Sequence, residues 1–364
     1  MKYLSTTVIA CVCALAPISF ATAMAHEVYV LTPVQVQEGL STKIDLMRVF
    51  DNPEDVRIFL EVTAAVLVLL VVNFLARHSQ AGRKLHARLS ALEPYGAVIV
   101  RVTIAASLFC SAATGSFLGP ELSLAMLPLA TVLRFVLFML SGMLLLGIGT
   151  EIAAAVTLVL FGVAGWIFGW YMITYANYLG EILVLVLFGA RRFSLDEQWI
   201  GSLKRFPELR RFESTIARVC YGIALCYAAI TIKFLHPELT VMVANQYHLT
   251  QFHWLFPSDP LLLTFGAGLA ELAIGIFIIL GFELRLALGI SLFSITLSLL
   301  FFGESVWPHL MLYGISLRLF FGEERCTVDQ FADEHTLHIL RKETERCGCN
   351  EKGLAGGQRG RVLA

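Results

Sequence analysis

Glu271 is the ionisable residue whose position in the sequence is least explained by packing alone. It lies near the middle of an apolar stretch that runs from 261 to 281. A charged side chain at the centre of a membrane-spanning helix costs roughly 3 kcal/mol on insertion scales, so it is usually buried against a partner. A carboxyl group there could relay protons or hydrogen-bond the carbonyl of a quinone. The alternative is a structural hydrogen bond or ion pair.

Three arginines also lie in or beside apolar stretches. Arg134 is deep in the stretch from 124 to 148 and is a candidate counter-ion for Glu271. Arg101 and Arg218 lie at the ends of two other stretches. Long basic side chains at such ends reach back to the membrane surface. We therefore expect Arg101 and Arg218 to extend to the surface in a structural role.

The composition indicates what kind of scaffold must hold these charges. Of 364 residues, 57% are hydrophobic and 15% are charged, against roughly 25% charged residues in a soluble domain. The net charge of -1 gives no hint of a nucleic-acid partner. The sequence therefore predicts an all-α polytopic membrane protein that is embedded in a lipid bilayer. Nine spans are expected, at 56–76, 96–118, 124–148, 152–172, 174–190, 219–236, 261–281, 286–303 and 308–321.

The N-terminus has the pattern of a secretory signal peptide. Lys2 precedes a short apolar core from Val8 to Ile18, and Ala23-Met24-Ala25 is a small-x-small cleavage site. This pattern predicts removal of 1–25 and a mature chain that begins at His26. The alternative is an uncleaved anchor helix.

Basic residues give an independent prediction of the orientation. They gather in the loop after the first span and in the loop after the fifth, and the loops 119–123, 174–178, 236–260 and 304–309 contain neither Lys nor Arg. Loops rich in Lys and Arg stay in the cytoplasm. We therefore expect a multi-pass protein of a bacterial-type inner (cytoplasmic) membrane. Its mature N-terminus would be periplasmic or extracellular, and its C-terminus cytoplasmic.

Two segments repeat one another 117 positions apart. They read RVTIAASLFCSAATGSFLGPEL from Arg101 and RVCYGIALCYAAITIKFLHPEL from Arg218. Each segment opens a block of four predicted spans that is entered from the same side of the membrane. The repeat is therefore predicted to be parallel, about an axis along the membrane normal.

The sequence divides into seven parts on this basis. They are a cleaved signal peptide (1–25), a short extracytoplasmic segment (26–55), a first transmembrane helix with a basic cytoplasmic loop (56–95), a first four-helix repeat (96–192), a cytoplasmic linker (193–217), a second four-helix repeat (218–322) and a cytoplasmic tail (323–364).

Histidines gather on the side predicted to face outwards. His26 would have a free α-amine after cleavage, and an amine with an imidazole can chelate copper(II). The others are His236, His248, His253 and His309. No HxH or HxxxH spacing accompanies them, and the alternative is a set of interfacial residues beside an aromatic belt.

The tail contains His335, His338, Cys326, Cys347 and Cys349. Such a set could hold zinc or copper(I), but its spacing fits no standard finger. We therefore expect a solvated tail. No nucleophilic triad, P-loop, haem-ligand pair, Fe–S cysteine spacing or dinucleotide fingerprint is present in the chain.

The second repeat resembles the DoxX family of four-helix membrane proteins over about 218–322. The matching residues are Arg218, Gly222, Lys233-Phe234, Pro237, Glu271, Gly275, Gly281 to Arg285 and Leu319-Phe320-Phe321-Gly322. The resemblance implies the architecture more strongly than an activity. DoxX-like proteins include subunits linked to quinol oxidation and thiosulfate oxidation, and others associated with oxidative-stress defence.

The first repeat departs from the family pattern at its most polar positions. Ser116, Leu137 and Glu151 stand where the second repeat has Lys233, Glu271 and Arg285. The resemblance thus implies that a site would lie in the second repeat, with Glu271 and Lys233 near a bound quinone. Glu151 and Arg285 occupy corresponding turns with opposite charges and could pair, chiefly as a packing device. Arg285 and Arg134 are also candidates for ligand binding or proton relay, with Glu271 and Lys233.

Three classes of function follow. The first is an accessory component of a quinone-linked or other membrane redox process, which would rely on bound quinone or on a soluble or membrane redox partner. The second is a transporter for a small solute or metal ion. The third is a membrane anchor for a partner protein. The sequence does not identify the chain as an enzyme.

Overall fold

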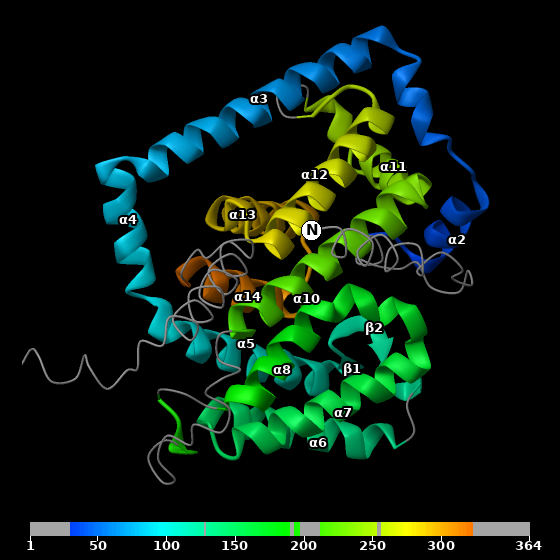
Figure 1. Cartoon of the computed structure of the whole chain (residues 1–364). Coiled ribbons are helices and arrows are strands. Elements are labelled where there is room, and N and C mark those ends of the chain that lie inside the picture. The colour runs from blue at the N-terminus through cyan, green and yellow to red at the C-terminus, as the bar shows by residue number, and fades with distance from the viewer. Residues whose placement is uncertain (1–29, 127–128, 190–192, 197–211, 253–255, 323–364) are drawn as a thin grey trace, which may run out of the picture. The chain divides into compact units, whose positions relative to one another are not determined.

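The computed structural model describes residues 30–126, 129–189, 193–196, 212–252 and 256–322 (Figure 1). These residues belong to one compact unit. The predicted signal peptide, His26, His253 and the tail with its histidines and cysteines lie outside the described residues. The described chain is helical except for one short β-hairpin.

The helices follow one another along the chain with few other elements between them. The α-helices are α2 (Pro33–Ser41), α3 (Pro53–His78), α4 (Gln80–Ser90), α5 (Glu93–Thr114), α6 (Ala130–Leu146), α7 (Thr150–Phe168), α8 (Ala176–Phe188), α10 (Glu213–Ala228), α11 (Pro237–Gln246), α12 (Pro260–Leu280), α13 (Leu284–Phe302) and α14 (Leu310–Phe321). The hairpin pairs β1 (Ser116–Phe117) with β2 (Gly119–Ser123). Short 3-10 or π-helical turns are η2 (Leu46–Phe50), η3 (Leu124–Met126), η4 (Gly169–Tyr175), η6 (Ala229–Phe234), η7 (Leu249–Gln251) and η8 (Trp307–His309).

Six helical segments of the described chain are long and apolar enough to cross a membrane. They are Pro53–His78, Glu93–Thr114, Thr150–Phe188, Glu213–Phe234, Pro260–Leu280 and Leu284–Phe302. Two of the nine expected spans correspond to shorter helices, α6 with 17 residues and α14 with 12. At 1.5 Å per residue, α14 spans about 18 Å, less than the ~30 Å of a bilayer core.

The segment Thr150–Phe188 covers two of the expected spans. Gly169 ends α7 with a φ of 61°, which favours glycine. Beyond it η4 leads into α8, and α8 packs back against α7. The 39-residue segment is therefore two packed helices and not one straight helix.

The expected span 96–118 ends earlier than predicted. Gly115 terminates α5 in the left-handed conformation, with a φ of 76°. The chain then enters the β-hairpin, where Leu118 has a φ of 66° and its N–H donates to Ser111 Oγ at 3.1 Å. Phe117 and Leu118 extend the apolar stretch past Gly115, so the predicted span continued to 118, although a glycine at this place is a helix-end signal.

The described bundle has a first half (α5 to α8) and a second half (α10 to α14). Within the first half α5 packs on α6 and α7 packs on α8, and within the second half α10 packs on α12 and α13 packs on α14. Two further helix pairings are of similar extent and join the halves. In these, α5 packs against α14 and α10 packs against α8. We call these two pairings the central interface.

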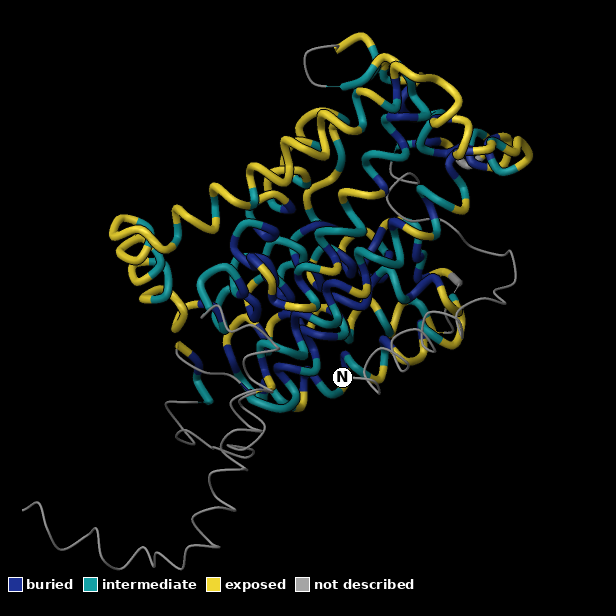
Figure 2. Tube along the Cα trace, turned by 45° about the horizontal axis from the view of Figure 1, so that its top comes forward, coloured by how far each residue is buried: buried dark blue, intermediate teal, exposed yellow. Residues whose placement is uncertain are grey.

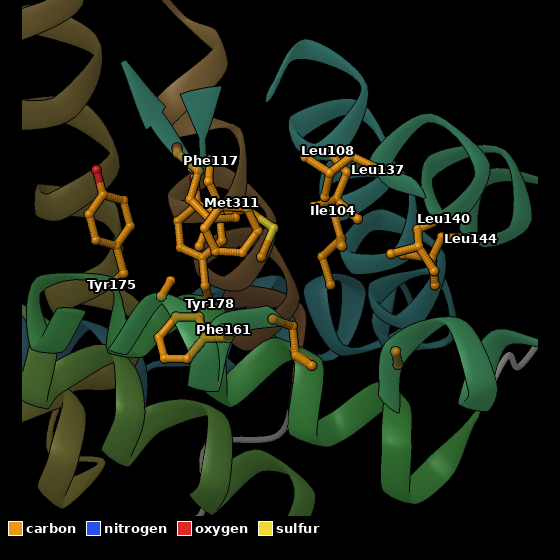
Figure 3. Packing of buried hydrophobic residues seen from close by; sticks show 14 of the residues in the cluster. Ile104, Leu108, Phe117, Leu137, Leu140, Leu144, Phe161, Tyr175, Tyr178 and Met311 are labelled. Carbon is orange, nitrogen blue, oxygen red and sulfur yellow. Dashed lines mark hydrogen bonds between the residues drawn. The ribbon is translucent and has the colours of Figure 1, made fainter. Parts of the chain in front are cut away.

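Buried apolar side chains cross the central interface. Met311 of α14 lies in the hydrophobic cluster of the first half, beside Phe117 and Tyr178 (Figure 3). In return, Val184 of α8 belongs to the cluster of the second half, with Tyr221 and Ile315. Each half therefore completes the core of the other.

Two glycines allow close approach at the central interface. A Cβ at Gly180 of α8 would lie 2.6 Å from Cys220 Cβ of α10, and a Cβ at Gly314 of α14 would lie 2.1 Å from Thr103 Oγ1 of α5. Small residues let helices pack closely in lipid, where the hydrophobic effect supplies little attraction between them. Both contacts would be lost if these positions carried larger side chains.

The helix α3 differs from the others because most of its surface is exposed (Figure 2). It contacts the bundle near both ends. Phe59 packs edge-on against Phe265 of α12 with ring centroids 5.6 Å apart, and Arg77 pairs with Glu283 at 3.2 Å. The exposed middle includes Val66 and Val72. An apolar surface of this kind suits contact with lipid chains.

The approach of α14 to α5 gives a testable prediction. Gly314→Leu would force α14 away from Thr103, and overpacking of this kind costs about 1–3 kcal/mol. We expect the variant to show a lower thermal midpoint in detergent. Gly142→Leu on α6 is the matched control, because Gly142 is exposed and a Cβ added there would meet no atom within 4 Å. Equal losses in the two variants would contradict the packing.

Candidate functional site

Lys233 and Glu271 form an ion pair between η6, which continues α10, and the helix α12. Lys233 Nζ lies 3.0 Å from Glu271 Oε2. The side chains are 16% and 25% exposed, so they are largely enclosed yet still accessible to a ligand. The sequence predicted that Glu271 needs a partner, and the structure identifies that partner as Lys233.

A π-helical turn positions Lys233. α10 continues into η6, and the N–H of Leu235 donates to Ile230 O at 3.0 Å, five residues back. Single π-helical turns are rare and frequently occur at functional sites. Gly268 of α12 faces this turn, and a Cβ there would lie 2.9 Å from Lys233 Cβ. The glycine thus allows Lys233 to reach Glu271 across a close helix pair.

The packing of α10 on α12 sets the register of this pair. A Cβ at Gly222 would lie 2.5 Å from Gly275 O, so the two backbones nearly touch. One turn nearer to the ion pair, Cys226 Sγ donates to Leu272 O at 3.8 Å. These contacts hold Glu271 opposite the end of α10.

Aromatic rings lie beside the ion pair. Phe234 follows Lys233 directly, and its ring centroid is 6.1 Å from that of Phe265. Phe265 also packs edge-on against Phe50 and Phe59. The site thus offers an ammonium donor, a carboxylate acceptor, and aromatic edges and faces.

The first half has no such pair at the corresponding positions. Leu137 is 1% exposed and belongs to the hydrophobic cluster of the first half. Ser116 is buried in β1, where its Oγ accepts from Thr114 Oγ1 at 3.3 Å. The polar site is therefore restricted to the second half.

Arg134 is not the partner of Glu271, contrary to the prediction from sequence. Its Nε donates to Ala112 O at 2.8 Å and its Nη2 to Ala113 O at 3.1 Å. The last carbonyls of a helix have no partner within the helix and attract a cation. Arg134 therefore caps the C-terminal end of α5.

The prediction that Arg101 and Arg218 extend to the membrane surface was wrong. Their exposures are 3% and 1%. Arg101 Nη2 donates to Phe193 O at 2.6 Å. Both side chains are enclosed by protein, because Arg101 lies on the buried face of α5 and Arg218 on the buried face of α10.

Arg285 and Glu151 do not pair, although the sequence allowed it. The Arg285 guanidinium donates to Phe320 O and Gly322 O at 2.9 and 2.8 Å, and to Ser90 Oγ of α4 at 2.8 Å. The carbonyls at the end of α14 compete for this cation. Glu151 instead lies against Gly189, where an added Cβ would be 2.8 Å from Glu151 Oε1.

The described histidines do not form a metal site. His236 Nδ1 contacts Glu238 Oε1 at 3.1 Å, His309 Nε2 lies 3.5 Å from Glu304 Oε2, and His248 is exposed. Among the described residues, no group of three or more His, Cys, Asp or Glu side chains could hold a metal ion. Copper binding at His26 stays a prediction.

The sequence interpretation missed a second set of buried charges. Glu181 of α8 is fully buried, and Arg318 of α14 pairs with Glu213 at the start of α10. Glu181 lies inside the predicted span 174–190 and Arg318 inside 308–321. A count of charges within the predicted spans would have found both.

Comparisons with known proteins add no family or function to this geometry. No protein-family model, no curated protein and no solved structure matches the chain.

The ion pair gives a testable prediction for stability. Lys233→Met or Glu271→Leu alone leaves one charge enclosed without its partner, whereas the double variant leaves neither. We expect the double variant to lose less stability than the sum of the two single variants, with a coupling of about 1 kcal/mol. Chemical unfolding in detergent measures it.

The control is the pair of Arg57 and Glu61 on α3. These side chains are 61% and 64% exposed and 3.7 Å apart, and exposed pairs contribute little. The corresponding cycle with Arg57→Met and Glu61→Leu should show coupling near zero. Strict additivity at Lys233 and Glu271 would contradict a stabilising ion pair.

Proposed function

We propose that this chain is a multi-pass inner-membrane protein of DoxX type that serves as an accessory component of a quinone-linked membrane redox process. The Lys233–Glu271 ion pair beside Phe234 and Phe265 is the observation that carries this proposal. It provides polar groups suited to a quinone head group at a partly accessible position between apolar helices. Electrons would come from a redox partner protein.

The packing supports a tandem duplication of one four-helix unit. Gly180 meets Cys220, and Gly314 meets Thr103. Thr103 and Cys220 are 117 positions apart, the same separation as Arg101 and Arg218 in the repeat. Each half thus uses a glycine of its last helix to approach the first helix of the other. This reciprocity is what a twofold axis between equivalent halves would produce.

The chemistry of the site suits a quinone in two respects. Lys233 can donate a hydrogen bond to one quinone carbonyl, and Glu271 can supply or accept a proton as the ring is reduced or oxidised. The rings of Phe234 and Phe265 can pack against the head group. A saturated apolar ligand would gain nothing from the ion pair, so the site favours a ring with polar edges.

Charge supports the proposed orientation. α4 has no buried residue and carries Arg83, Lys84 and Arg88. Its His86 and Ser90 contact Arg285, which also binds the C-terminal end of α14. We assign this end of the bundle to the cytoplasm, where basic segments are retained. The helix α11 would then lie on the outer side with the N-terminal segment that packs on it.

Quinone binding is the first test of this proposal. Purified protein in lipid nanodiscs is dialysed to equilibrium against a short-chain ubiquinone. We expect the wild type to bind, and Lys233→Met and Glu271→Gln each to weaken binding about tenfold, the equivalent of ~1.4 kcal/mol for one lost polar contact. Glu61→Gln on exposed α3 is the control and should bind like the wild type. Failure of the wild type to bind would reject the quinone site.

The orientation has its own test. A membrane-impermeant maleimide is applied to spheroplasts and to inverted vesicles that contain Lys84→Cys or Gln251→Cys, with the unsubstituted chain as the background. Lys84→Cys should react only in inverted vesicles and Gln251→Cys only in spheroplasts. The reverse pattern would invert the assigned topology.

A further inference from the structure

Glu181 is a buried carboxyl group that the quinone proposal does not use. Its side chain is 0% exposed, and neither Oε1 nor Oε2 has a hydrogen-bond partner. An ionised carboxylate without partners inside a membrane protein costs several kcal/mol, so such groups are held in protonated form or in contact with water. Packing gives no reason for a glutamate here, because a leucine would fill the same space without this penalty.

Glu181 lies on the central interface between the halves. Cys220 of α10 approaches its neighbour Gly180, and the backbone of Ile315 and the guanidinium of Arg318, both on α14, are close enough to act on its charge. One turn earlier on the same face of α8, Asn177 is 1% exposed and its Nδ2 has no partner. Two buried polar side chains with unsatisfied atoms on one helix face are the surroundings in which proteins hold internal water.

Polar groups continue from Glu181 toward one end of the bundle. Tyr178, three residues earlier on α8, donates its hydroxyl hydrogen to Pro308 O at 2.8 Å. His309 follows Pro308 directly, at the start of α14. Its Nε2 lies 3.5 Å from Glu304 Oε2. We call this the His309 end. Each step along α8 or α14 is about one helical turn, ~5 Å, which one water molecule can bridge.

Polar groups also continue in the other direction. Arg318, one turn beyond Ile315 along α14, pairs with Glu213 at the first residue of α10. We call this the Glu213 end. The Arg318 guanidinium thus contacts the carboxylate of Glu213, and its charge also acts on the buried carboxyl group of Glu181. It can neutralise Glu181 whenever that residue gives up its proton.

We propose that Glu181 is a proton-binding residue in a water-containing path along the central interface, which carries protons between the His309 end and the Glu213 end. The Glu181 carboxylate accepts a proton from water beside Tyr178, and its carboxyl O–H bond forms as a water O–H bond breaks. The proton then leaves to water beside Arg318 and Glu213, and Arg318 balances the charge that remains. This path is separate from Lys233 and Glu271, so it does not depend on quinone binding.

Proton flux into vesicles tests the proposal. Purified full-length protein is reconstituted into liposomes that contain a pH-sensitive dye, and a potassium gradient with valinomycin drives protons inward. The wild type should acidify the interior faster than protein-free vesicles, and Glu181→Gln should lose this excess. Glu61→Gln should retain it. Wild-type flux at the protein-free rate, or equal flux in Glu181→Gln, would overturn the proposal.

Two further measurements keep the result interpretable. Because glutamine fills the same space as glutamate and removes a buried ionisable group, Glu181→Gln should unfold at the wild-type temperature or above it. Tyr178→Phe removes one hydroxyl from the path and should slow the flux without abolishing it. A Glu181→Gln variant that is strongly destabilised would show that the carboxylate is a structural ion-pair partner of Arg318, and would overturn the proposal. Quinone binding by Glu181→Gln should match the wild type, which separates this proposal from that of the Lys233 site.

Discussion

The structure depends on the close approach of helices across the central interface. In lipid, an apolar helix face gains little by leaving the solvent, so helices associate through van der Waals packing and polar contacts. Gly180 and Gly314 supply the first kind of interaction, because they bring α8 against α10 and α14 against α5. The second kind is supplied by polar contacts between the halves, such as the hydroxyl of Tyr178 on α8, which donates to Pro308 O before α14. Neither half would have a complete core without the other, as Met311 shows in the cluster of the first half (Figure 3).

The two halves share their pairings but differ in polarity. Where α12 presents Glu271 to Lys233, α6 presents Leu137 to the cluster of apolar residues around α5. An ion pair that is enclosed in apolar surroundings seldom adds net stability over well-packed hydrophobic residues. The first half has an apolar residue at the same position, and this contrast is the reason that we propose a ligand-binding role for the charged pair in the second half. Glu181 raises the same question in the first half, because α14, the last helix of the second half, contains no Asp or Glu.

Sequence reasoning located most helices and singled out Glu271, which the structure pairs with Lys233 in the candidate site. Apolar stretches of membrane-spanning length located α3, α5, α10, α12 and α13, and the isolated carboxylate at Glu271 was recognised by its cost in a membrane. The partner of Glu271 could not be derived, because Lys233 reaches it only through the π-helical turn and the gap at Gly268. The burial of Arg101 and Arg218 was missed for a related reason. The sequence around a basic residue near a helix end is the same whether its side chain extends to the surface or is enclosed by a neighbouring helix.

The pairing of the halves is the claim on which the shared core and the proton path both depend, whereas the Lys233 site depends on the packing of α10 on α12 within the second half. A map by electron cryomicroscopy of the protein in lipid nanodiscs would test it directly. It should show α14 against α5 and α8 against α10, with density between Lys233 and Glu271. Two self-contained bundles, with α5 packed on α8 and α10 packed mainly on α14, would contradict it.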